Sequence, residues 1–374
     1  MSAFGGKADI RRRRLNGLLL TQSGHGAPPF KQVGQAGMMP VLASVAAMKR
    51  REFVYLLGGA LVARPDIVRS QPAKKIPTIG HLWHAGSAKE ETPYYEALLE
   101  GFSRLGYVDG FNFRLLHRFP NENPERLKSM AAELVSMNVD VLMGGALASA
   151  YLRDATKTIP IVFMFVPDPV GMKFVQSLAR PGGNATGLAN FGSDLAGKRL
   201  QLFKELVPGL HRVGLLATPN NEVSQLTARV LLAAGDQLGL KLKTFEAGSL
   251  DEVEPTIDAM AKAGMQGLIL AQGGIGFQAK NIIPKLALAR GLPVCASSKA
   301  TFEHGALLSY AADDVELCRQ SAVYADKILK GAKPGEIPVE QPTKLELLIN
   351  LKTAKALGLQ VPTHIQQIAD QVVE

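Results

Sequence analysis

The sequence has few cysteines and lacks the short motifs of the common hydrolytic and nucleotide-binding sites. Its two cysteines, Cys295 and Cys318, form no CxxC motif. We expect free buried thiols rather than a disulfide, although the sequence does not show whether the two meet. No G-x-x-x-x-G-K-[ST] loop, no G-x-S-x-G elbow and no H-E-x-x-H pair is present. These absences argue against P-loop, α/β-hydrolase and zincin chemistry, and no catalytic constellation emerges.

The greater part of the chain also lacks an excess of basic residues, despite a net charge of +9. Residues 1–75 hold 13 of the 42 Lys and Arg residues but only 3 of the 33 Asp and Glu residues. The other 299 residues therefore hold 29 basic and 30 acidic residues, so their charges nearly cancel. A DNA-binding domain keeps a basic face, so we expect no nucleic-acid partner for this part of the chain. With 47% hydrophobic residues in 374, the chain can build one large or two ordinary domains.

No apolar run near the N-terminus approaches the roughly 20 residues that a membrane-spanning helix needs. Lys49-Arg50-Arg51 precedes an apolar run of 11 residues, Phe53–Ala63, and Val68–Ser70 offers a small-residue cleavage site. This order predicts an export signal over residues 48–71, of the twin-arginine or general secretory type. A short buried helix preceded by charges is the alternative.

Residues 1–47 are rich in Gly, Pro and Ala and show no amphipathic period. We interpret them as a disordered tail or as an over-extended gene start. The basic run Arg11–Arg14 leaves a nucleic-acid arm as an alternative.

From Ile76 onward, short β-type runs alternate with helical runs, which is typical of a parallel α/β sheet. The predicted strands are Ile76–Leu82, Phe111–Arg118, Val139–Met143, Ile159–Val166, Arg212–Ala217, Leu240–Glu246, Gly267–Ala271, Leu292–Ala296, Leu307–Tyr310 and Leu345–Asn350. The predicted helices are Pro93–Leu105, Pro124–Met137, Ala148–Ala155, Val170–Leu178, Glu222–Leu238, Leu250–Lys262, Gly276–Arg290, Val315–Lys330 and Leu351–Leu357.

The second half of this pattern repeats the first. Three landmark pairs recur at offsets of 134, 133 and 133: Gly80 and Gly214, Gly106 and Gly239, Pro160 and Pro293. A constant offset predicts two similar lobes, with chance recurrence of common turn residues as the alternative. Extended segments late in the chain indicate crossings between them. We assign 76–188 plus 308–335 to lobe 1 and 189–307 plus 336–374 to lobe 2, with Leu307–Tyr310 as a crossing strand.

Ligands of open α/β sheets bind beyond the carboxyl ends of the strands, and two such lobes would direct these ends at one cleft. The residues just after the predicted strands or at predicted crossings are mostly neutral donors and acceptors, a set that suits a small solute. These candidate ligand-binding residues are Trp83, His84, Ser87, Ala148, Ser149, Asp168, Asn190, Asn220, Asn221, Gln272, Ser297, Ser298 and Tyr310.

Each candidate also has a structural interpretation. Trp83, the only tryptophan, suits stacking on a planar group but could equally cap the core. Asp168 precedes a proline and could simply cap a helix. The Ser and Asn residues could serve as turn residues. The carboxylate pairs Glu90-Glu91 and Asp313-Asp314 look like helix-start charges rather than a paired acid and base.

Two further patterns are weak signals. His81-x-x-His84 lacks a third metal ligand nearby in the sequence, so we expect no metal site. Gly274–Ala279 matches the dinucleotide pattern G-x-G-x-x-A, yet the next strand ends at Ala296-Ser297-Ser298 without an acidic residue for a ribose. A cytoplasmic nucleotide-using enzyme is therefore the alternative function, and a regulator with a basic DNA arm ranks last.

Several stretches resemble the ABC-transporter substrate-binding proteins of the tryptophan or aromatic-solute type. They are IGHLW, ELV near Glu133, PIVFMFVPDPVG, LARPGGNATG and LKGAKPGEIPVEQPTKLELLINLKTAKALGL, and the leader MKRREFVYLLGGALVA resembles the exported starts of such proteins. The resemblance implies a type I periplasmic binding-protein fold, with two doubly wound lobes and three crossings. It also implies a monomeric periplasmic receptor without enzymatic activity or cofactor, which delivers a small organic solute to an ABC permease and ATPase.

Within the resemblance, Asp168 and Ser297 match positions expected at the ligand. The sequence departs at Gln272-Gly273, where several amino-acid-binding relatives carry a carboxylate. An α-amino acid would then lack one partner for its ammonium, so an amino acid, an aromatic acid or another small organic acid stays open as the solute.

Overall fold

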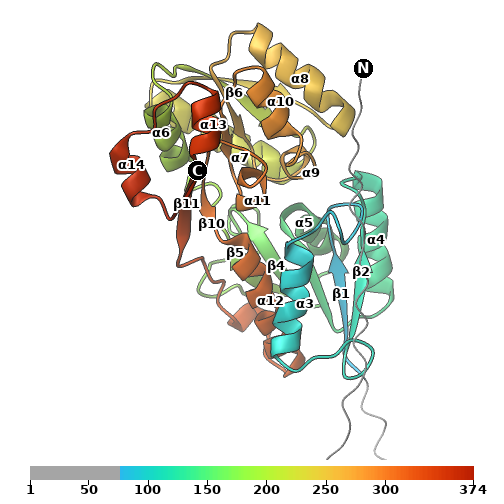
Figure 1. Cartoon of the computed structure of the whole chain (residues 1–374). Helices are drawn as coiled ribbons and strands as arrows, with labels where there is room; N and C mark the ends of the chain where they lie inside the picture. Colours follow the sequence, from blue (N-terminus) through green and yellow to red (C-terminus); the bar gives the residue numbers. More distant parts are fainter. Residues whose placement is uncertain (1–75) are drawn as a thin grey trace, which may run out of the picture. The chain divides into compact units, whose positions relative to one another are not determined.

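The computed structural model describes residues 76–374, so the predictions for residues 1–47 and 48–71 lie outside the described residues. The described part forms two lobes, each built around one sheet with helices on both faces (Figure 1). In Figure 1 lobe 1 lies below and lobe 2 above.

Lobe 1 is a five-stranded parallel sheet in the order β2-β1-β3-β4-β5. Its strands are β1 (Thr78–Leu82), β2 (Arg114–Arg118), β3 (Val141–Gly145), β4 (Ile161–Val166) and β5 (Ala185–Ala189). Helices α3 (Tyr94–Arg104) and α12 (Asp314–Leu329) pack side by side on one face (Figure 1). Helices α4 (Pro124–Ser136) and α5 (Ala146–Ala155) cover the other.

Lobe 2 is a seven-stranded sheet in the order β12-β11-β10-β9-β8-β6-β7, in which only the β10–β11 pair is antiparallel. Its strands are β6 (Arg212–Ala217), β7 (Lys241–Glu246), β8 (Gly267–Leu270), β9 (Val294–Ala296), β10 (Leu308–Ala312), β11 (Leu345–Asn350) and β12 (Gln371–Val373). One face packs on α6 (Ala196–Leu206), α7 (Glu222–Gln237) and α13 (Leu351–Ala356), the other on α8 (Leu250–Lys262) and α10 (Ile283–Ala289). Two short helices, α9 (Ile275–Gln278) and α11 (Lys299–Phe302), follow β8 and β9, and α14 (Thr363–Ile368) precedes β12.

The predicted repeat between the lobes is confirmed by the strand order. The first five strands of each lobe follow one plan, since β2-β1-β3-β4-β5 in lobe 1 matches β7-β6-β8-β9-β10 in lobe 2. Gly80 of β1 and Gly214 of β6 occupy equivalent places. A Cβ on Gly80 would lie 3.0 Å from a Leu134 methyl of α4, and one on Gly214 would lie 2.9 Å from the Met260 sulfur of α8. Both glycines therefore let a covering helix approach the central strand closely.

Alternation along the strands sends successive side chains into separate cores. In lobe 1, Ile79 joins the core under α3 and α12, whereas Leu82 joins the core under α4 and α5. In lobe 2, Leu215 packs toward α6 and α7, and Leu216 toward α8 and α10. Because both faces are covered, the central strands β3, β4 and β8 are apolar throughout, as is typical of parallel sheets, whereas the edge strands β2 and β7 carry polar residues.

Asparagine and aspartate side chains set the starts of several helices. The amide oxygens of Asn123, Asn221 and Asn350 accept the N3 backbone N–H of α4, α7 and α13. The Asp313 carboxylate accepts N–H groups of Val315 and of the residue after it at the start of α12. Such caps satisfy N–H groups that have no partner within the helix.

Three crossings join the lobes. The chain passes from β5 to α6, returns from β10 to α12, and leaves lobe 1 a last time between the 3₁₀ turn η3 (Pro334–Glu336) and β11. The predicted crossing strand Leu307–Tyr310 differs from the structure. It forms β10, which lies inside the lobe 2 sheet between β9 and β11, so the crossing follows it, at residues 312–314.

Two helix predictions are wrong for identifiable reasons. Residues 170–178 form turns rather than a helix, because Lys173 takes a left-handed backbone conformation (φ 59°). The predicted helix over 276–290 is split into α9 and α10 by turn residues 279–282. Elements β5, α6, α11, α14 and β12 are not among the predicted ones.

Candidate ligand-binding site

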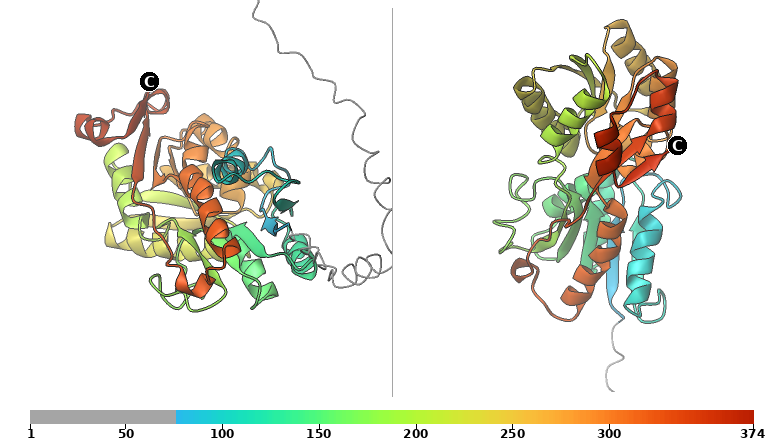
Figure 2. Two further views of the ribbon diagram at one scale, coloured as in Figure 1. Left: turned by 90° about the horizontal axis from the view of Figure 1, so that it is seen from below. Right: turned by 60° about the vertical axis from the view of Figure 1, so that its left-hand side comes forward.

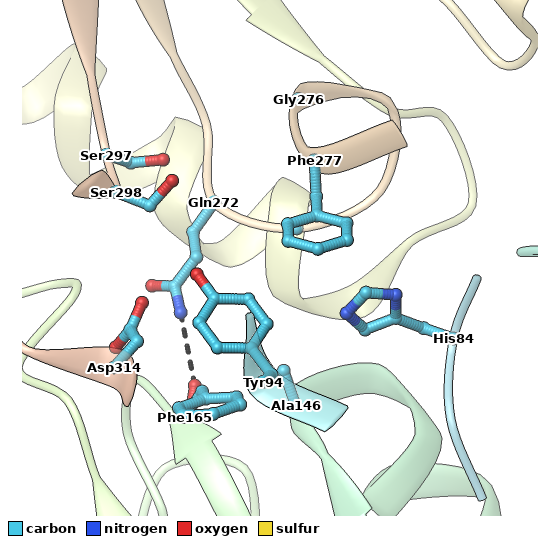
Figure 3. Close-up of a pocket in the computed structure, with 11 residues that line it drawn as sticks. His84, Tyr94, Ala146, Phe165, Gln272, Gly276, Phe277, Ser297, Ser298 and Asp314 are labelled. Carbon is cyan, nitrogen blue, oxygen red and sulfur yellow. Dashed lines mark hydrogen bonds between the residues drawn. The ribbon is translucent and has the colours of Figure 1, made fainter. Parts of the chain in front are cut away.

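A cavity of about 60 Å³ lies between the lobes, at the carboxyl ends of their strands. Figure 3 shows its lining side chains converging from both sides. Lobe 1 provides His84, Tyr94, Ala146, Phe165 and Asp314, and lobe 2 provides Gln272, Gly273, Gly276, Phe277, Ser297 and Ser298. One buried water needs about 10–15 Å³ of such space, so the cavity suits a small solute or part of one.

Gln272 holds the two lobes together at the cavity wall. Its Nε2 donates to the backbone carbonyl of Phe165 in lobe 1 at 3.1 Å (Figure 3). Its Oε1 lies 1.9 Å from the position a Cβ of Gly192 would take, on the segment that crosses after β5. Glycine at 192 is therefore required for Gln272 to reach across, and the clamp is closed in this structure.

Aromatic rings form one wall of the cavity. Tyr94 lies 5.4 Å from Phe165 and 5.6 Å from Phe277, measured between ring centroids. His84 meets Phe277 edge-on at 4.6 Å. Because Phe277 comes from lobe 2 and the other rings from lobe 1, the wall is complete only when the lobes are closed. Such a wall favours a flat or apolar group.

Two wall residues have left-handed backbone conformations that non-glycine residues rarely adopt: Phe165 (φ 60°) and Ala146 (φ 26°). The pairing of β4 with β5 shifts register between Phe163 and Val166, so a bulge turns Phe165 out of the ladder. A Cβ on Gly145 would lie 3.3 Å from the Phe165 ring, which glycine therefore accommodates. Strain of this kind is typical of ligand sites.

Asp314 is the charged group of the opposite wall. It follows the cap residue Asp313 at the start of α12, and its carboxylate shares a hydrogen bond with the Asn190 side chain. Its Oδ1 is shielded from solvent and has no hydrogen-bond partner. Burial raises the pKa of Asp314 to about 7, and the neighbouring Asp313 adds to this, whereas the Asn190 hydrogen bond and the charge of Arg199 oppose it.

His84 packs against two carboxylates, the buried Glu91 and the partly buried Glu122. Its Nδ1 lies 3.3 Å from Glu91 and 3.5 Å from Glu122. The Glu91 carboxylate accepts the backbone N–H groups of His84 and Ala85 at 3.0 and 2.8 Å. Burial raises the pKa of Glu122 to about 7, with His84 opposing the rise. Glu91 is 1% exposed and braces this loop, which corrects its interpretation as a helix-start charge.

The structure brings four of the predicted site residues to the cavity: His84, Gln272, Ser297 and Ser298. Asn190 does not itself line the cavity, but its side chain forms a hydrogen bond with the Asp314 carboxylate, which does. Ser298 also caps α11, since its Oγ accepts the N–H of Thr301.

Other predicted residues of lobe 1 lie away from the cavity. Trp83 is 3% exposed in the lobe 1 core, stacked on His81 at 3.8 Å, and its indole N–H donates to His117. Ser87 lies in the loop before α3 and bonds Glu90. Ala148 is a core residue of α5, and the Ser149 hydroxyl donates to the carbonyl of Gly144. Asp168 accepts the N–H of Gly171 and stabilises the turn after β4.

The remaining predicted residues of lobe 2 also have structural roles. Asn220 has a left-handed conformation (φ 59°) before α7, and Asn221 caps that helix. Tyr310 packs against the lobe 2 core, and its carbonyl accepts Nε of Arg199 at 3.1 Å.

The side chains that the sequence did not reveal as lining residues are Tyr94, Ala146, Phe165, Phe277 and Asp314. Tyr94 and Phe277 belong to helices, and Phe165 is inside a strand, so the rule of looking just after strands misses them. Asp314 carried a signal, because two adjacent acidic residues exceed what a single helix cap needs. Asp313 caps α12, so the Asp314 side chain is not needed as a cap and lines the cavity instead.

The dinucleotide-like stretch Gly274–Ala279 forms a different structure. Helix α9 has four residues, and the hydroxyl of Thr218 accepts its first N–H, from Ile275, at 2.8 Å. Ala279 is fully buried. The helix end that would hold a pyrophosphate is occupied, which disfavours the nucleotide alternative.

Within residues 76–374, no group of three or more His, Cys, Asp or Glu side chains is placed to hold a metal ion. No helix in that part of the chain is both long and apolar enough to traverse a bilayer. Cys295 and Cys318 are free and buried, each in the core of a different lobe.

Two lobes of matching topology, three crossings and a cavity between them at the strand ends define a solute-binding clamp with the type I periplasmic binding-protein fold. The chain belongs to the ABC transporter substrate-binding protein family, whose model matches residues 89–373. Members of this family are solute-binding proteins that act outside the cytoplasm.

Individual relatives agree with this assignment. A tyrosine-binding protein of Clostridioides difficile is 27% identical over 275 residues, which cover 72% of this chain and 79% of the relative. An ABC domain from Streptococcus pneumoniae in complex with L-Trp is 25% identical, with a TM-score of 0.72 over 79% of this chain and 99% of that one. A conserved domain protein from Vibrio cholerae is 28% identical, with a TM-score of 0.74 over 80% and 100%.

Proposed function

We propose that this chain is the exported receptor of an ABC importer, which clamps one small organic solute between its lobes and delivers it to a permease. The observation that supports this most directly is the cavity, whose lining residues come from both lobes, which meet through Gln272 and Phe165. A solute bound there would stabilise the closed clamp, which a permease can distinguish from the open one. The chain would act without enzymatic activity, as a monomer, and residues 48–71 would direct its export.

The aromatic wall and two of the named relatives suggest an aromatic solute. One relative is called a tyrosine-binding protein, and the other was crystallised with L-Trp. In this chain the rings of Tyr94, Phe165 and Phe277 would hold the flat part of such a solute. The polar groups of Ser297 and Ser298 would then face its polar end.

A thermal-shift screen tests the proposal. Amino acids, aromatic acids, aromatic amines and sugars are added to the purified chain at a hundredfold excess over Kd, where binding adds about 2.7 kcal/mol to the free energy of unfolding. Phe277→Ala removes part of the wall and should abolish the shift. Phe111→Ala changes a ring that is 76% exposed and far from the lining set, and should retain it.

Uptake in the native organism completes the test. Deleting the gene should abolish accumulation of the radiolabelled solute, and the wild-type chain should restore it. Turnover of a solute by the purified chain, or normal uptake in the deletion strain, would contradict the proposal.

A further inference from the structure

Asp314 places an unsatisfied negative group against the cavity. Its Oδ1 is shielded from solvent and has no donor among the described residues, although Asn190 bonds the same carboxylate. A buried acceptor without a donor destabilises the empty protein. A solute that brings an N–H donor to Oδ1 would remove this penalty, and a charged donor would do so most strongly.

The cavity has no lysine or arginine to match Asp314, and the one histidine in its lining, His84, faces Glu91 and Glu122. Arg199 is the cation behind Asp314, but it is 1% exposed, donates through Nε to the Tyr310 carbonyl and does not line the cavity. A carboxylate on the solute would therefore meet hydroxyls and backbone but no lysine or arginine, and it would lie near the charge of Asp314.

The aromatic wall adds to this preference. The faces of Tyr94, Phe165 and Phe277 carry the negative side of their ring quadrupoles, which attracts cations and repels anions. In Figure 3 these rings and Asp314 surround the same space, with Asp314 on the side of Gln272 and the serines. A flat body against the rings would leave a short amino-bearing arm to reach the carboxylate.

From this geometry, and resting on the proposed function, we infer that the solute is an amine whose protonated amino group binds Asp314, and that a carboxylate is not required for binding. Asp314 is then the residue that selects amines over the corresponding acids. This role separates the two halves of an amino acid: the ammonium determines recognition, and the carboxylate is tolerated.

Matched solutes test the inference directly. The full chain is titrated calorimetrically with tyrosine, tyramine and 3-(4-hydroxyphenyl)propionate, and with tryptophan, tryptamine and indole-3-propionate. Within at least one series, the amine should bind within about tenfold of the amino acid, because both carry the ammonium. The propionate should bind at least tenfold more weakly than either.

Variants assign the effect to the carboxylate. Asp314→Asn keeps the shape and removes the charge, and it should weaken amine binding by roughly 10- to 100-fold while leaving the propionate unchanged or tighter. Asp313→Asn is the matched control, because asparagine also caps a helix and position 313 does not line the cavity. Circular dichroism melts show whether both variants fold.

The outcomes separate this inference from the proposed function. Equal or tighter binding of the propionates, unchanged amine affinity in folded Asp314→Asn, or a solute without an amino group found in the thermal-shift screen would overturn the inference and leave the receptor function standing. The absence of any solute for the wild-type chain, with normal uptake in the deletion strain, would overturn both.

Discussion

At the scale of a single residue, Asp314 links solute affinity to pH. Its pKa is raised from 3.8 to about 7, mainly by burial, and the groups that face it are Asp313, Arg199, Tyr94 and Cys318. Below pH 7 the carboxyl is protonated and offers no charge to an ammonium. Lowering the pH through 7 should therefore weaken amine binding, approaching about tenfold per pH unit well below 7.

The measurement is Kd of the amine between pH 5.5 and 8.5. Glu122 also has a pKa of about 7 and lies beside His84, which lines the cavity, so it could produce a similar slope. Asp314→Asn separates the two, because its profile should be flat if Asp314 is responsible. A slope that persists in this variant would transfer the pH dependence to Glu122.

The sequence predicted single residues of this site where one rule sufficed. His84, Gln272, Ser297 and Ser298 follow strands, and parallel strands bring their carboxyl ends to one edge. The aromatic wall was not predictable in this way. Phe165 reaches the cavity only because a bulge turns it out of β4, and a bulge has no reliable sequence signal in a uniformly apolar strand.

At the scale of elements, the contact between α3 and α12 depends on one glycine. A Cβ on Gly101 would lie 2.3 Å from the backbone carbonyl oxygen of Arg319. Gly101→Ala should lower the free energy of unfolding by about 1–3 kcal/mol, because the two helices must separate. Urea denaturation followed by circular dichroism measures this change.

A second helical glycine provides the control. A Cβ on Gly197 of α6 would have no heavy atom within 4 Å. Gly197→Ala should stabilise the protein by about 0.5–1 kcal/mol through helix propensity alone. Equal changes in the two variants would show that the close contact at Gly101 is unimportant.

Helix bounds could be predicted from the sequence where a proline or a glycine marks the start or the end of the helix. The predicted bounds of α3, α4 and α7 agree with the structure to within two residues, since Pro124 begins α4 and glycines 106 and 239 follow the ends of α3 and α7. The prediction over 170–178 failed because hydrophobic spacing favours a helix there, whereas the turn around Asp168 and Lys173 breaks it. Tertiary context outweighed propensity in that segment.

At the scale of the whole described body, the repeat offset of 133–134 residues predicted two lobes, and the shared strand order confirms them. The contacts between the closed lobes could not be predicted from the sequence. They join residues more than 100 positions apart and depend on how the two sheets face each other. Gln272 to Phe165 is one of them, and Lys280 to Glu90 is another.

Lys280 is placed to control how fast the clamp opens. Its Nζ donates across the lobes to the carbonyl of Glu90 at 2.8 Å and lies 3.7 Å from the centroid of the Phe277 ring. Only the hydrogen bond to Glu90 joins the two lobes, because Phe277 belongs to lobe 2 as Lys280 does. Breaking that bond should favour the open state, and Lys280 itself does not line the cavity.

Lys280→Met keeps the aliphatic stem and removes the charge, and it should raise the dissociation rate of the solute about 5- to 10-fold, as the loss of roughly 1 kcal/mol predicts. Stopped-flow measurements give this rate, and small-angle scattering should show a larger radius of gyration for the ligand-free variant. Lys285→Met, on the exposed side of α10, is the control and should behave as wild type. If Lys280→Met keeps both the wild-type dissociation rate and the wild-type radius, the closed state is held by Gln272 and the aromatic wall alone.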